Sequence, residues 1–505
     1  MNLQQFFSKQ GYDISEKLNW EKYITIWTSW YRGKVRKFHN YYIYNGQRKV
    51  KMEKKSMQGA KKVAEDWADL LFNEKVKINL KSKKDTEALN EILRENNATV
   101  IINQGIEKSF AIGTGALVVS VQDIEEGENT LDVTNARVKL EFVECKKIVP
   151  LTWENRKITE CAFVTTKYRK GQTYIYIAMH VKNEQGNYVI KNYMFKGKYS
   201  SFVEANEEEK EGFIDEFDTK SNIPWFAIIT PNICNNIDSE TPFGLSVYAN
   251  AIDTLKCLDN AYDGLDNETT IGRRRIFVSG EMLSYDEGEQ RMVFDPNDIS
   301  VYRMPQGFNK DQMIEHDDAS LRTSSYIEAV NYQLNILSSK VGFGNERYKF
   351  DGQAIQTATG VISENSDMFR TIKKHEQVLE SSLITIVKAI AYASTVFGNV
   401  TINASVVTID FDDSIIEDRG AEQVRAMQEV AQNLRSHKSY IEEYRDLNEE
   451  QALEEMEQIQ QEKMSNQEAF GFTVNNDIKE NDNDEGNKNK EKEEKKNNED
   501  DKKEE

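Results

Sequence analysis

One helical pattern constrains this sequence more than any other feature, because it is unusually long. Apolar residues recur at three- and four-residue spacing from Ala354 to Ile390, and the segment 354–400 predicts a helix of about forty residues. Such a helix exceeds the usual globular length, so we expect it to kink or to bridge domains. Prolines do not interrupt it, since all six lie at or before Pro305.

Two shorter helical patterns precede the long one and flank an insert. A connector that contains three prolines ends at Pro242, and the pattern after it predicts a helix over 243–269. A second helix is predicted over 319–341. The segment between them, 270–318, holds the strand-like runs RRRIFVSG, RMVFD and ISVYRMP. The chain is therefore expected to form one helix, then a small inserted domain, and then a second helix that returns from that domain.

The rest of the chain mixes both kinds of element, which predicts an α+β protein that is predominantly helical. An amphipathic helix is expected over 57–71. Short alternating runs separated by turn signals predict one antiparallel meander over 116–195. A strand is predicted within 401–415 and a helical hairpin within 416–466. The charged tail, 471–505, has almost no apolar residues and is predicted to be disordered.

Composition limits the classes to which the chain can belong. At 505 residues we expect two to four structural units rather than one core. The sequence contains no run of eighteen apolar residues, so no membrane span is predicted. The N-terminus also lacks the pattern of a secretory signal. The four cysteines are scattered, which fits a reducing compartment better than disulfides or a zinc site.

The net charge of −20 is unevenly distributed. Up to Lys84 there are 19 Lys and Arg against 8 Asp and Glu, so the remainder of the chain carries −31. A protein that coats DNA would be basic overall. This distribution instead predicts contact with acidic partners over a limited region.

Basic and aromatic residues are interleaved in the early block WYRGKVRKFHNYYIYNGQRKVKMEKK, which we expect to be rich in turns. The aromatic residues are Trp30, Tyr31, Tyr41, Tyr42 and Tyr44. Such a block can bind single-stranded nucleic acid by stacking. It can equally be an arm that lies on a neighbouring subunit. We favour the second, structural interpretation.

Nucleotide binding is not supported by the sequence, despite a G-x-G spacing in KVGFGNERYKFDG at 340–352. A dinucleotide fingerprint needs G-x-G-x-x-G between a strand and a helix, whereas here Arg347 stands at the third position and a helix precedes the loop. The P-loop pattern occurs nowhere. We expect neither a catalytic constellation nor a cofactor.

A carboxylate pair, Asp410 and Asp412, is the one candidate for a divalent-metal site. Two-metal nucleases need several carboxylates that converge from different segments. This pair comes from a single strand, so we favour a role in ending that strand and capping the next helix. No metal is therefore expected.

Two further clusters of charge fall in the helix–insert–helix region. Asp259, Asp263 and Asp266 lie at i, i+4 and i+7 and form one acidic stripe on the first helix. That stripe is either an ordinary solvated face or a surface that lines an internal channel. The run Arg273, Arg274 and Arg275 could meet DNA, an acidic partner or the next subunit, and the sequence leaves these open.

The order of these parts resembles the portal proteins of tailed bacteriophages, most closely those of siphophages. The resemblance covers the chain to about residue 470. It rests on three stretches, KSMQGAKKVAEDWADLLFNEKVKI, TPFGLSVYANAIDTLKCLDNAYDGL and FDGQAIQTATGVISENSDMFRTIKKHE. None of them is an active-site signature, so the specificity comes from their order and spacing.

The resemblance implies a fold with named regions. The wing would comprise 1–242, the long helix 354–400 and a strand in 401–415. The helices 243–269 and 319–341 would be the stem, and the insert 270–318 the clip. The loop 342–353 would be the tunnel loop, and 416–470 the crown. The subunits would assemble as a ring, typically of twelve.

The resemblance also implies partners and site residues. Double-stranded DNA would pass through the channel during packaging and ejection. The clip would dock the terminase large subunit and then head–tail adaptor proteins, with major capsid and scaffolding proteins around the ring and no membrane. The protein would be found in the host cytoplasm during assembly and then at a capsid vertex of the virion.

The candidate site residues are of three kinds, and the channel-facing position of the acidic stripe is inferred from helical phase, since the resemblance does not establish it. They are the tunnel-loop residues Asn345, Glu346, Arg347, Tyr348 and Lys349; the channel-facing stem residues Asp259, Asp263, Asp266 and Lys340; and the clip residues Arg273, Arg274 and Arg275. Two alternatives remain, a capsid-associated minor structural or adaptor protein and a metal-dependent nuclease.

Overall fold

The computed structural model forms two compact units, Met1–Asp418 and Arg419–Glu505, which we describe separately. It describes residues 1–469 except 45–47, 123–124, 127–130, 133–135, 170, 211–212, 272–274, 279–283, 287–290, 294–300, 304–313, 318–319, 345–346, 349–357, 398–399, 412–418 and 446–448. Helices and strands alternate through the chain, which fits the expected α+β class.

The long helix is confirmed as one element, α9 (Ala358–Phe397), of 40 residues. Met368, Ile372, Leu379, Leu383 and Ile390 are all at most 2% exposed and belong to the largest hydrophobic core. By length and composition its part 367–397 could cross a membrane, yet 56% of its apolar window is buried inside the protein. Burial within the fold therefore accounts for the apolar composition of α9.

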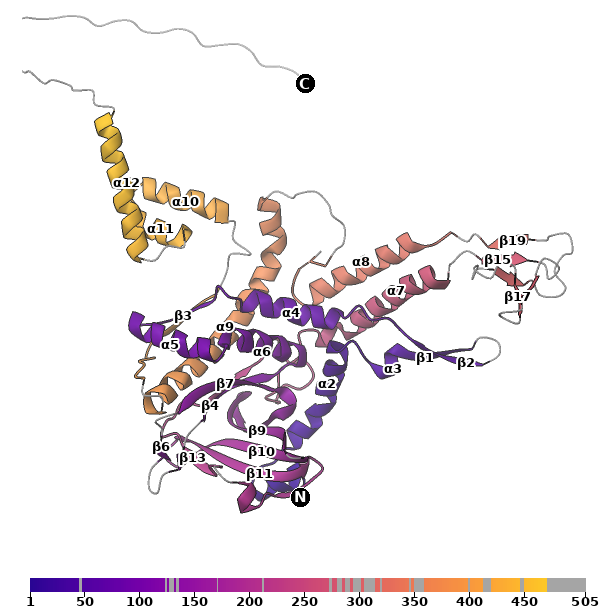
Figure 1. Cartoon of the computed structure of the whole chain (residues 1–505), viewed down its shortest axis with the longest axis horizontal. Helices are drawn as coiled ribbons and strands as arrows, with labels where there is room; N and C mark the ends of the chain where they lie inside the picture. The colour runs from indigo at the N-terminus through magenta and orange to yellow at the C-terminus, as the bar shows by residue number, and fades with distance from the viewer. Residues whose placement is uncertain are drawn as a thin grey trace, which may run out of the picture. The chain divides into compact units, whose positions relative to one another are not determined.

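Helices and short strands of the N-terminal part pack around α9 and its neighbours (Figure 1). The predicted amphipathic helix is α4 (Gly59–Leu71), which contacts α9 and α6. The remaining elements are α1 (Leu3–Lys9), α2 (Ser15–Tyr31), α3 (Arg36–His39), β1 (Asn40–Tyr44), β2 (Lys49–Glu53), β3 (Lys77–Leu80), α5 (Lys83–Glu95) and α6 (Ala98–Ile112). The predicted strand near the end of this unit is β20 (Val407–Asp410), which pairs antiparallel with β3.

The basic, aromatic block differs from the turn-rich segment that we expected. Trp30 and Tyr31 end α2, whose buried face includes Trp20, Ile24 and Trp27. The following residues form an antiparallel hairpin, β1–β2. Polar residues at the start of α2 concealed its apolar spacing, while the alternation in NYYIY and KVKME is that of strands.

The predicted meander is wrong in one respect, because its strands divide between two sheets. β4 (Gly115–Gln122) and β7 (Arg137–Glu144) pair with each other, and β14 (Phe226–Ile229) joins β4 from about a hundred residues later. The short 3₁₀ turn Cys145–Lys147 redirects the chain into the second sheet. There β8 (Ile148–Glu154), β9 (Lys157–Arg169), β10 (Gln172–Lys182), β11 (Tyr188–Lys198) and β12 (Ser201–Glu204) follow in order, and β13 (Glu216–Asp218) also pairs with β11. A short pair, β5 (Glu125–Glu126) with β6 (Leu131–Asp132), lies between β4 and β7 in the chain.

The predicted order of helix, insert and helix is confirmed, but both helices begin at later residues than the sequence suggested. α7 (Ile252–Ile271) follows an irregular stretch and a 3₁₀ turn, and α8 (Thr323–Lys340) packs along it. The insert contains β15 (Arg275–Val278), which pairs with β18 (Val301–Arg303) and β19 (Ile314–Asp317). β16 (Ser284–Asp286) pairs with β17 (Arg291–Val293).

The second unit has three described helices rather than the predicted helical hairpin. They are α10 (Arg419–Ala431), α11 (His437–Tyr444) and α12 (Glu449–Ala469). The polar sequence that we took as one second helix is divided after Tyr444. Ser436 begins the middle helix by accepting a hydrogen bond from the Ser439 amide, at 3.1 Å, as an N-cap.

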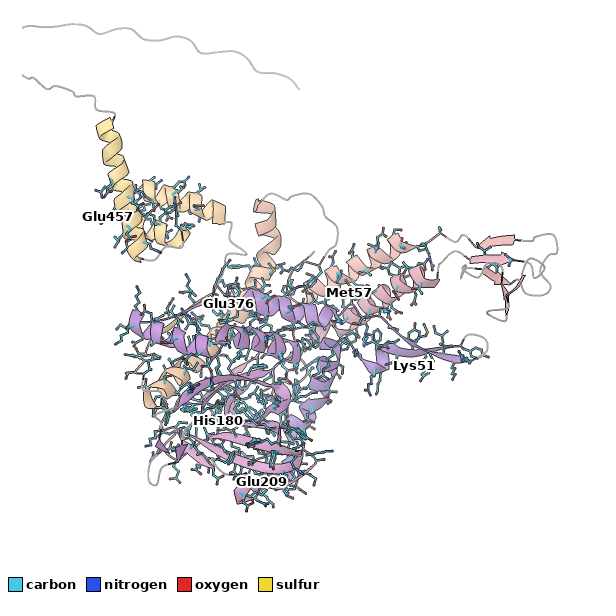
Figure 2. The ribbon with its side chains drawn as sticks, in the orientation of Figure 1. Lys51, Met57, His180, Glu209, Glu376 and Glu457 are labelled. Carbon is cyan, nitrogen blue, oxygen red and sulfur yellow. The ribbon has the colours of Figure 1, made fainter. Side chains whose placement is uncertain are left out.

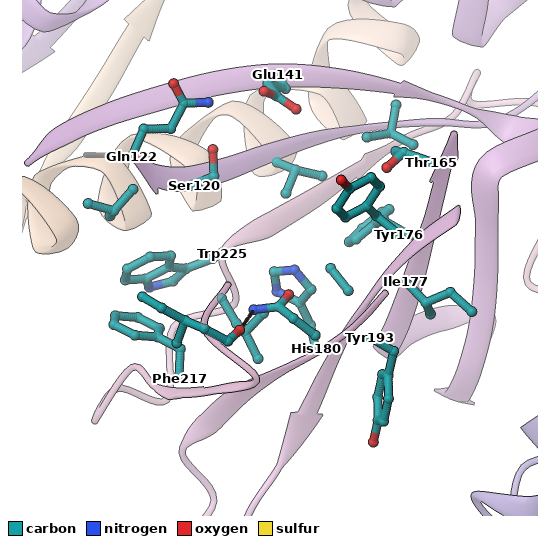
Figure 3. Close-up of a pocket in the computed structure, with 18 of the residues that line it drawn as sticks. Ser120, Gln122, Glu141, Thr165, Tyr176, Ile177, His180, Tyr193, Phe217 and Trp225 are labelled. Carbon is teal, nitrogen blue, oxygen red and sulfur yellow. Dashed lines mark hydrogen bonds between the residues drawn. The ribbon is translucent and has the colours of Figure 1, made fainter. Parts of the chain in front are cut away.

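A cavity of about 790 Å³ lies between the two sheets of the first unit (Figure 3). Three of its lining residues have a buried polar atom without a hydrogen-bond partner among the described residues: Ser120 Oγ, His180 Nδ1 and Trp225 Nε1. The His180 ring packs edge-on against Phe163 and Phe226, and burial lowers its pKa to about 3. His180 is therefore neutral in the folded protein at ordinary pH.

Stability should fall as the pH falls below about 6.5, because the unfolded chain can protonate His180 and the folded chain cannot. The free energy of unfolding should drop by about 2 kcal/mol from this histidine between pH 7.5 and pH 5. The variant His180→Phe removes the titrating group while its ring keeps two aromatic neighbours. Denaturant unfolding at pH 7.5, 6 and 5 should show a shallower decline for this variant.

The matched control is His437→Phe, at an exposed histidine of α11. It should keep the pH dependence of the wild-type protein. Parallel declines for wild type and His180→Phe would contradict the assignment of His180 as a buried neutral histidine.

Candidate functional site

The paired helices α7 and α8 form the base of the candidate site. Leu255 and Leu258 of α7 are buried with Val330, Leu334 and Leu337 of α8. At the far end, next to the insert, Arg322 binds Glu268 through two side-chain contacts of 2.9 and 3.2 Å. Hydrogen bonding from the Arg322 side chain lowers the pKa of Glu268. This ion pair joins the two helices where the chain returns from the insert.

Asp259 and Asp263 bind the segment of chain between β2 and α4. Asp259 Oδ1 accepts the Met57 amide at 2.8 Å, and its Oδ2 lies 2.9 Å from His39 Nε2. Asp263 Oδ1 accepts the Lys55 amide at 2.9 Å, and its Oδ2 accepts Asn267 Nδ2 at 3.0 Å. Each of the four carboxylate oxygens therefore has a partner within the same chain.

This geometry corrects the prediction that these two carboxylates face a channel. Asp259 is 3% exposed and Asp263 is 7% exposed, because residues 54–57 cover them. A buried carboxylate whose oxygens are all hydrogen-bonded within its own chain is not part of the surface that a passing polyanion would contact. Asp266 is only half-buried, and Lys340 is exposed in the last turn of α8. For these two the channel assignment stays a prediction.

The loop after α8 begins on an aromatic stack. Trp67 Nε1 of α4 donates to the Val341 carbonyl at 3.2 Å. The Phe343 ring lies on the Trp67 indole with centroids 4.5 Å apart and planes 21° apart. His375 of α9 also packs against Trp67 in a T-shaped arrangement, with ring centroids 4.8 Å apart. These contacts tie the start of the loop to α4 and α9.

The two glycines of this loop allow the backbone to turn after α8. Gly342 and Gly344 have φ of +91° and +77°, in the left-handed region that glycine adopts without strain. A side chain at Gly342 would also lie 2.7 Å from the Thr371 methyl group. They end α8 and start the loop, which is consistent with rejecting a phosphate cradle.

The structure describes two of the five predicted loop residues, and they differ. Arg347 is exposed, with its guanidinium 5.7 Å from the Phe343 ring centroid. Tyr348 is half-buried, edge-on to Phe343, and burial raises the pKa of its hydroxyl. It lines a cavity of about 300 Å³ with residues of α8 and of the chain around Gly59. Asn345, Glu346 and Lys349 lie outside the described residues.

The other predicted residues are less informative. Arg273 and Arg274 fall outside the described part of the chain, and only the backbone of Arg275, at the start of β15, is described. Asp410 accepts a hydrogen bond from Asn79 Nδ2 at 2.8 Å across β20 and β3, and Asp412 is not described. Within the described residues no three His, Cys, Asp or Glu come together as a metal site.

Sequence reasoning missed the residues that anchor the site. His39, Trp67 and His375 were not among the predicted site residues, yet each contacts a different predicted element. The helical phase carried a signal for Asp259, since it lies one turn from Leu255 and next to Leu258. A polar residue beside an apolar stripe is a candidate for burial with a partner.

Comparison with known proteins assigns the family. A family model described as phage portal protein, SPP1 Gp6-like, matches residues 14–469. The chain belongs to this portal protein family. The family places the portal protein in the phage virion, as a connector component, and its members are generally structural rather than enzymatic.

Two other comparisons concern solved structures and curated proteins. One matching solved structure is a chain titled "Neck of native GTA particle computed with C12 symmetry", with 10% sequence identity. The match covers 76% of the portal protein and 87% of that chain, with a TM-score of 0.33. No curated protein sequence matches.

Removing the Asp259 carboxylate should release the segment that it holds. We expect Asp259→Ala to increase tryptic cleavage after Lys54 and Lys55, because Met57 and His39 lose their partner on α7. Each hydrogen bond to a charged group contributes about 1.5–3 kcal/mol, so local opening should rise more than tenfold. Limited proteolysis with mass spectrometry measures the cleavage rate at these lysines.

Asp266→Ala is the control, because it removes a carboxylate of the same helix that no described contact uses. It should leave cleavage at Lys54 and Lys55 unchanged. Equal protection in wild type and Asp259→Ala would contradict the holding role of Asp259.

Proposed function

We propose that this portal protein forms the ring-shaped DNA channel at one capsid vertex, through which phage DNA is packaged and ejected. The observation that carries the proposal is the family match over residues 14–469, which spans the helix pair, the loop and the long helix together. The ring is proposed to contain twelve subunits. It would assemble in the host cytoplasm and remain in the virion.

The regions of the chain take their proposed roles from this assignment. α7 and α8 would be the stem, and residues 270–318 the clip that docks the terminase large subunit and later the head–tail adaptors. Residues 342–353 would be the tunnel loop, and α10–α12 the crown. Major capsid and scaffolding proteins would contact the outside of the ring. Arg273, Arg274 and Arg275 are proposed for the clip interface.

A channel for DNA must guide phosphate without holding it. Dense Lys and Arg contacts would bind the duplex tightly and with strong salt dependence. The placement of Arg347 supports a weaker contact, since it is exposed on a loop anchored at one end by Phe343 and Trp67. Symmetry would repeat each such cation around the channel. Lys340 and Asp266 are proposed to line the stem part of the same channel.

Imaging tests the ring directly. Purified full-length protein should give rings with a central hole in negative-stain electron microscopy and a mass of about twelve subunits in solution. Multi-angle light scattering measures that mass. A monodisperse monomer across protein concentration and salt would contradict the portal ring and favour a minor structural or adaptor protein.

Loss of the loop cations should impair DNA movement and spare assembly. The double variant Arg347→Ala/Lys349→Ala keeps Tyr348, so the packed part of the loop stays in place. We expect normal rings with reduced DNA packaging or retention, measured as DNase-protected DNA per particle. Lys81→Ala/Lys84→Ala removes two exposed cations elsewhere and should package normally. Normal packaging by the loop variant would refute the proposed contact.

A further inference from the structure

The β1–β2 hairpin presents two different faces. In the antiparallel register Tyr42 stands opposite Lys51, and Tyr44 opposite Lys49, so these four side chains share one face. On the other face Tyr41 stands opposite Met52, and Ile43 opposite Val50. One face is therefore aromatic and cationic, and the other is entirely apolar.

No third strand of the described chain covers this hairpin. β1 and β2 pair only with each other among the described strands. On the apolar face Ile43 is 45% exposed and Tyr41, Val50 and Met52 are half-buried, while Tyr42 and Tyr44 of the cationic face are 67% and 66% exposed. A two-stranded hairpin is marginally stable in water unless another element packs on it. The apolar face therefore needs a partner from outside this subunit.

The base of the hairpin is nevertheless held firmly. His39 contacts Asp259 of α7 directly before β1, and Lys54 Nζ donates to Asn260 Oδ1 at 2.6 Å directly after β2. The hairpin projects from α7 on the side away from α8 (Figure 1), and Lys51 lies on the projecting part (Figure 2). It is thus an arm with a fixed root.

Charge indicates what the arm meets. Residues 34–55 contain eight Lys and Arg and one Glu, whereas the insert 270–318 contains ten Asp and Glu and six Arg and Lys. The opposite net charges, +7 and −4, belong to the same chain. Like charges within one arm repel, and the acidic insert of another copy offers the complement.

Exposed apolar side chains also lie on and next to α8. Tyr332 and Glu328 lie one turn apart on the face of α8 turned away from the buried Val330 and Leu337, and Leu321 lies just before the helix. Tyr332 is 64% exposed and Leu321 is 48% exposed. α7 lies between α8 and the hairpin (Figure 1). Two different surfaces on opposite sides of one subunit are what a head-to-tail contact in a ring uses.

We propose that the β1–β2 hairpin docks onto a second copy of this chain, with its apolar face against the outer face of α8 and its lysines toward the acidic insert. This inference rests on the proposed ring, in which each subunit gives its arm to one neighbour and receives one from the other. The contact removes the apolar face of the hairpin from water and fixes the order of subunits around the ring.

Assembly of hairpin variants is the first test. Ile43→Asp/Val50→Asp places two charges on the apolar face and should raise the protein concentration needed for assembly at least about tenfold. Val203→Asp changes an apolar residue on β12 that is more exposed than Ile43, at 64% against 45%, and should assemble as wild type. Circular dichroism should show the same body fold in both variants, because the hairpin packs on no core.

Cross-linking between two chains identifies the receiving surface. In a Cys234→Ser/Cys257→Ser background, one chain carries Ile43→Cys and the other carries Tyr332→Cys. A short bis-maleimide should join them only when both chains are mixed and assembled. The matched pair, Val203→Cys with Tyr332→Cys, should give no product.

The outcomes separate the inference from the proposed function. Rings that form normally from Ile43→Asp/Val50→Asp, without the cross-link, overturn the hairpin contact and leave the portal ring intact. Normal rings with weaker DNA binding assign the hairpin to DNA and also overturn it. A wild-type chain that stays monomeric overturns both. Lost assembly together with the specific cross-link supports the inference.

Discussion

The burial of Trp67 is the interaction on which the central part of this protein depends. Its side chain is fully buried, and it contacts four elements at once. The indole N–H donates to the Val341 carbonyl, and Phe343 stacks on the ring. Phe110 of α6 packs against it in a tilted arrangement, and His375 of α9 packs in a T-shaped one. Because aromatic side chains bury so much apolar surface, one residue of α4 can fix the end of α8 and the start of the loop relative to α9.

The buried carboxylates of α7 likewise hold several segments of the chain together. Burying Asp259 and Asp263 would be costly without partners, and the chain supplies backbone amides from residues 54–57 together with His39. Those bonds give the hairpin a fixed root on the helix pair. The partners of both carboxylates therefore come from the same chain. Arg347, Lys340 and Asp266 are the described residues that remain candidates for the proposed channel surface.

The sequence predicted those structural elements whose pattern lies within one stretch of the chain, and it failed where an element's partner is distant in sequence. The long helix, the helix pair around an insert and the strand at 407–410 were confirmed, because spacing of 3.6 or 2 residues records which side of an element is buried. The single meander failed because alternation shows that β4 and β7 are strands without showing their partner, and β14 comes from far along the chain. Among the site residues, Arg347 is exposed and its assignment to the channel stays a prediction, whereas Asp259 and Asp263 are buried and not on a channel surface.

The sequence by itself determined the order of elements, the positions of the glycines that end α8 and the family to which the chain belongs. Each of these is written in local spacing or in the order of stretches along the chain. Only the tertiary structure decided which charges reach water. Asp259, Asp263 and Asp266 look alike on a helical projection, but residues 54–57 pack over the first two. Burial of a side chain depends on segments that are distant in sequence. The contact with residues 54–57 is what makes Asp259 and Asp263 buried while Asp266 is not.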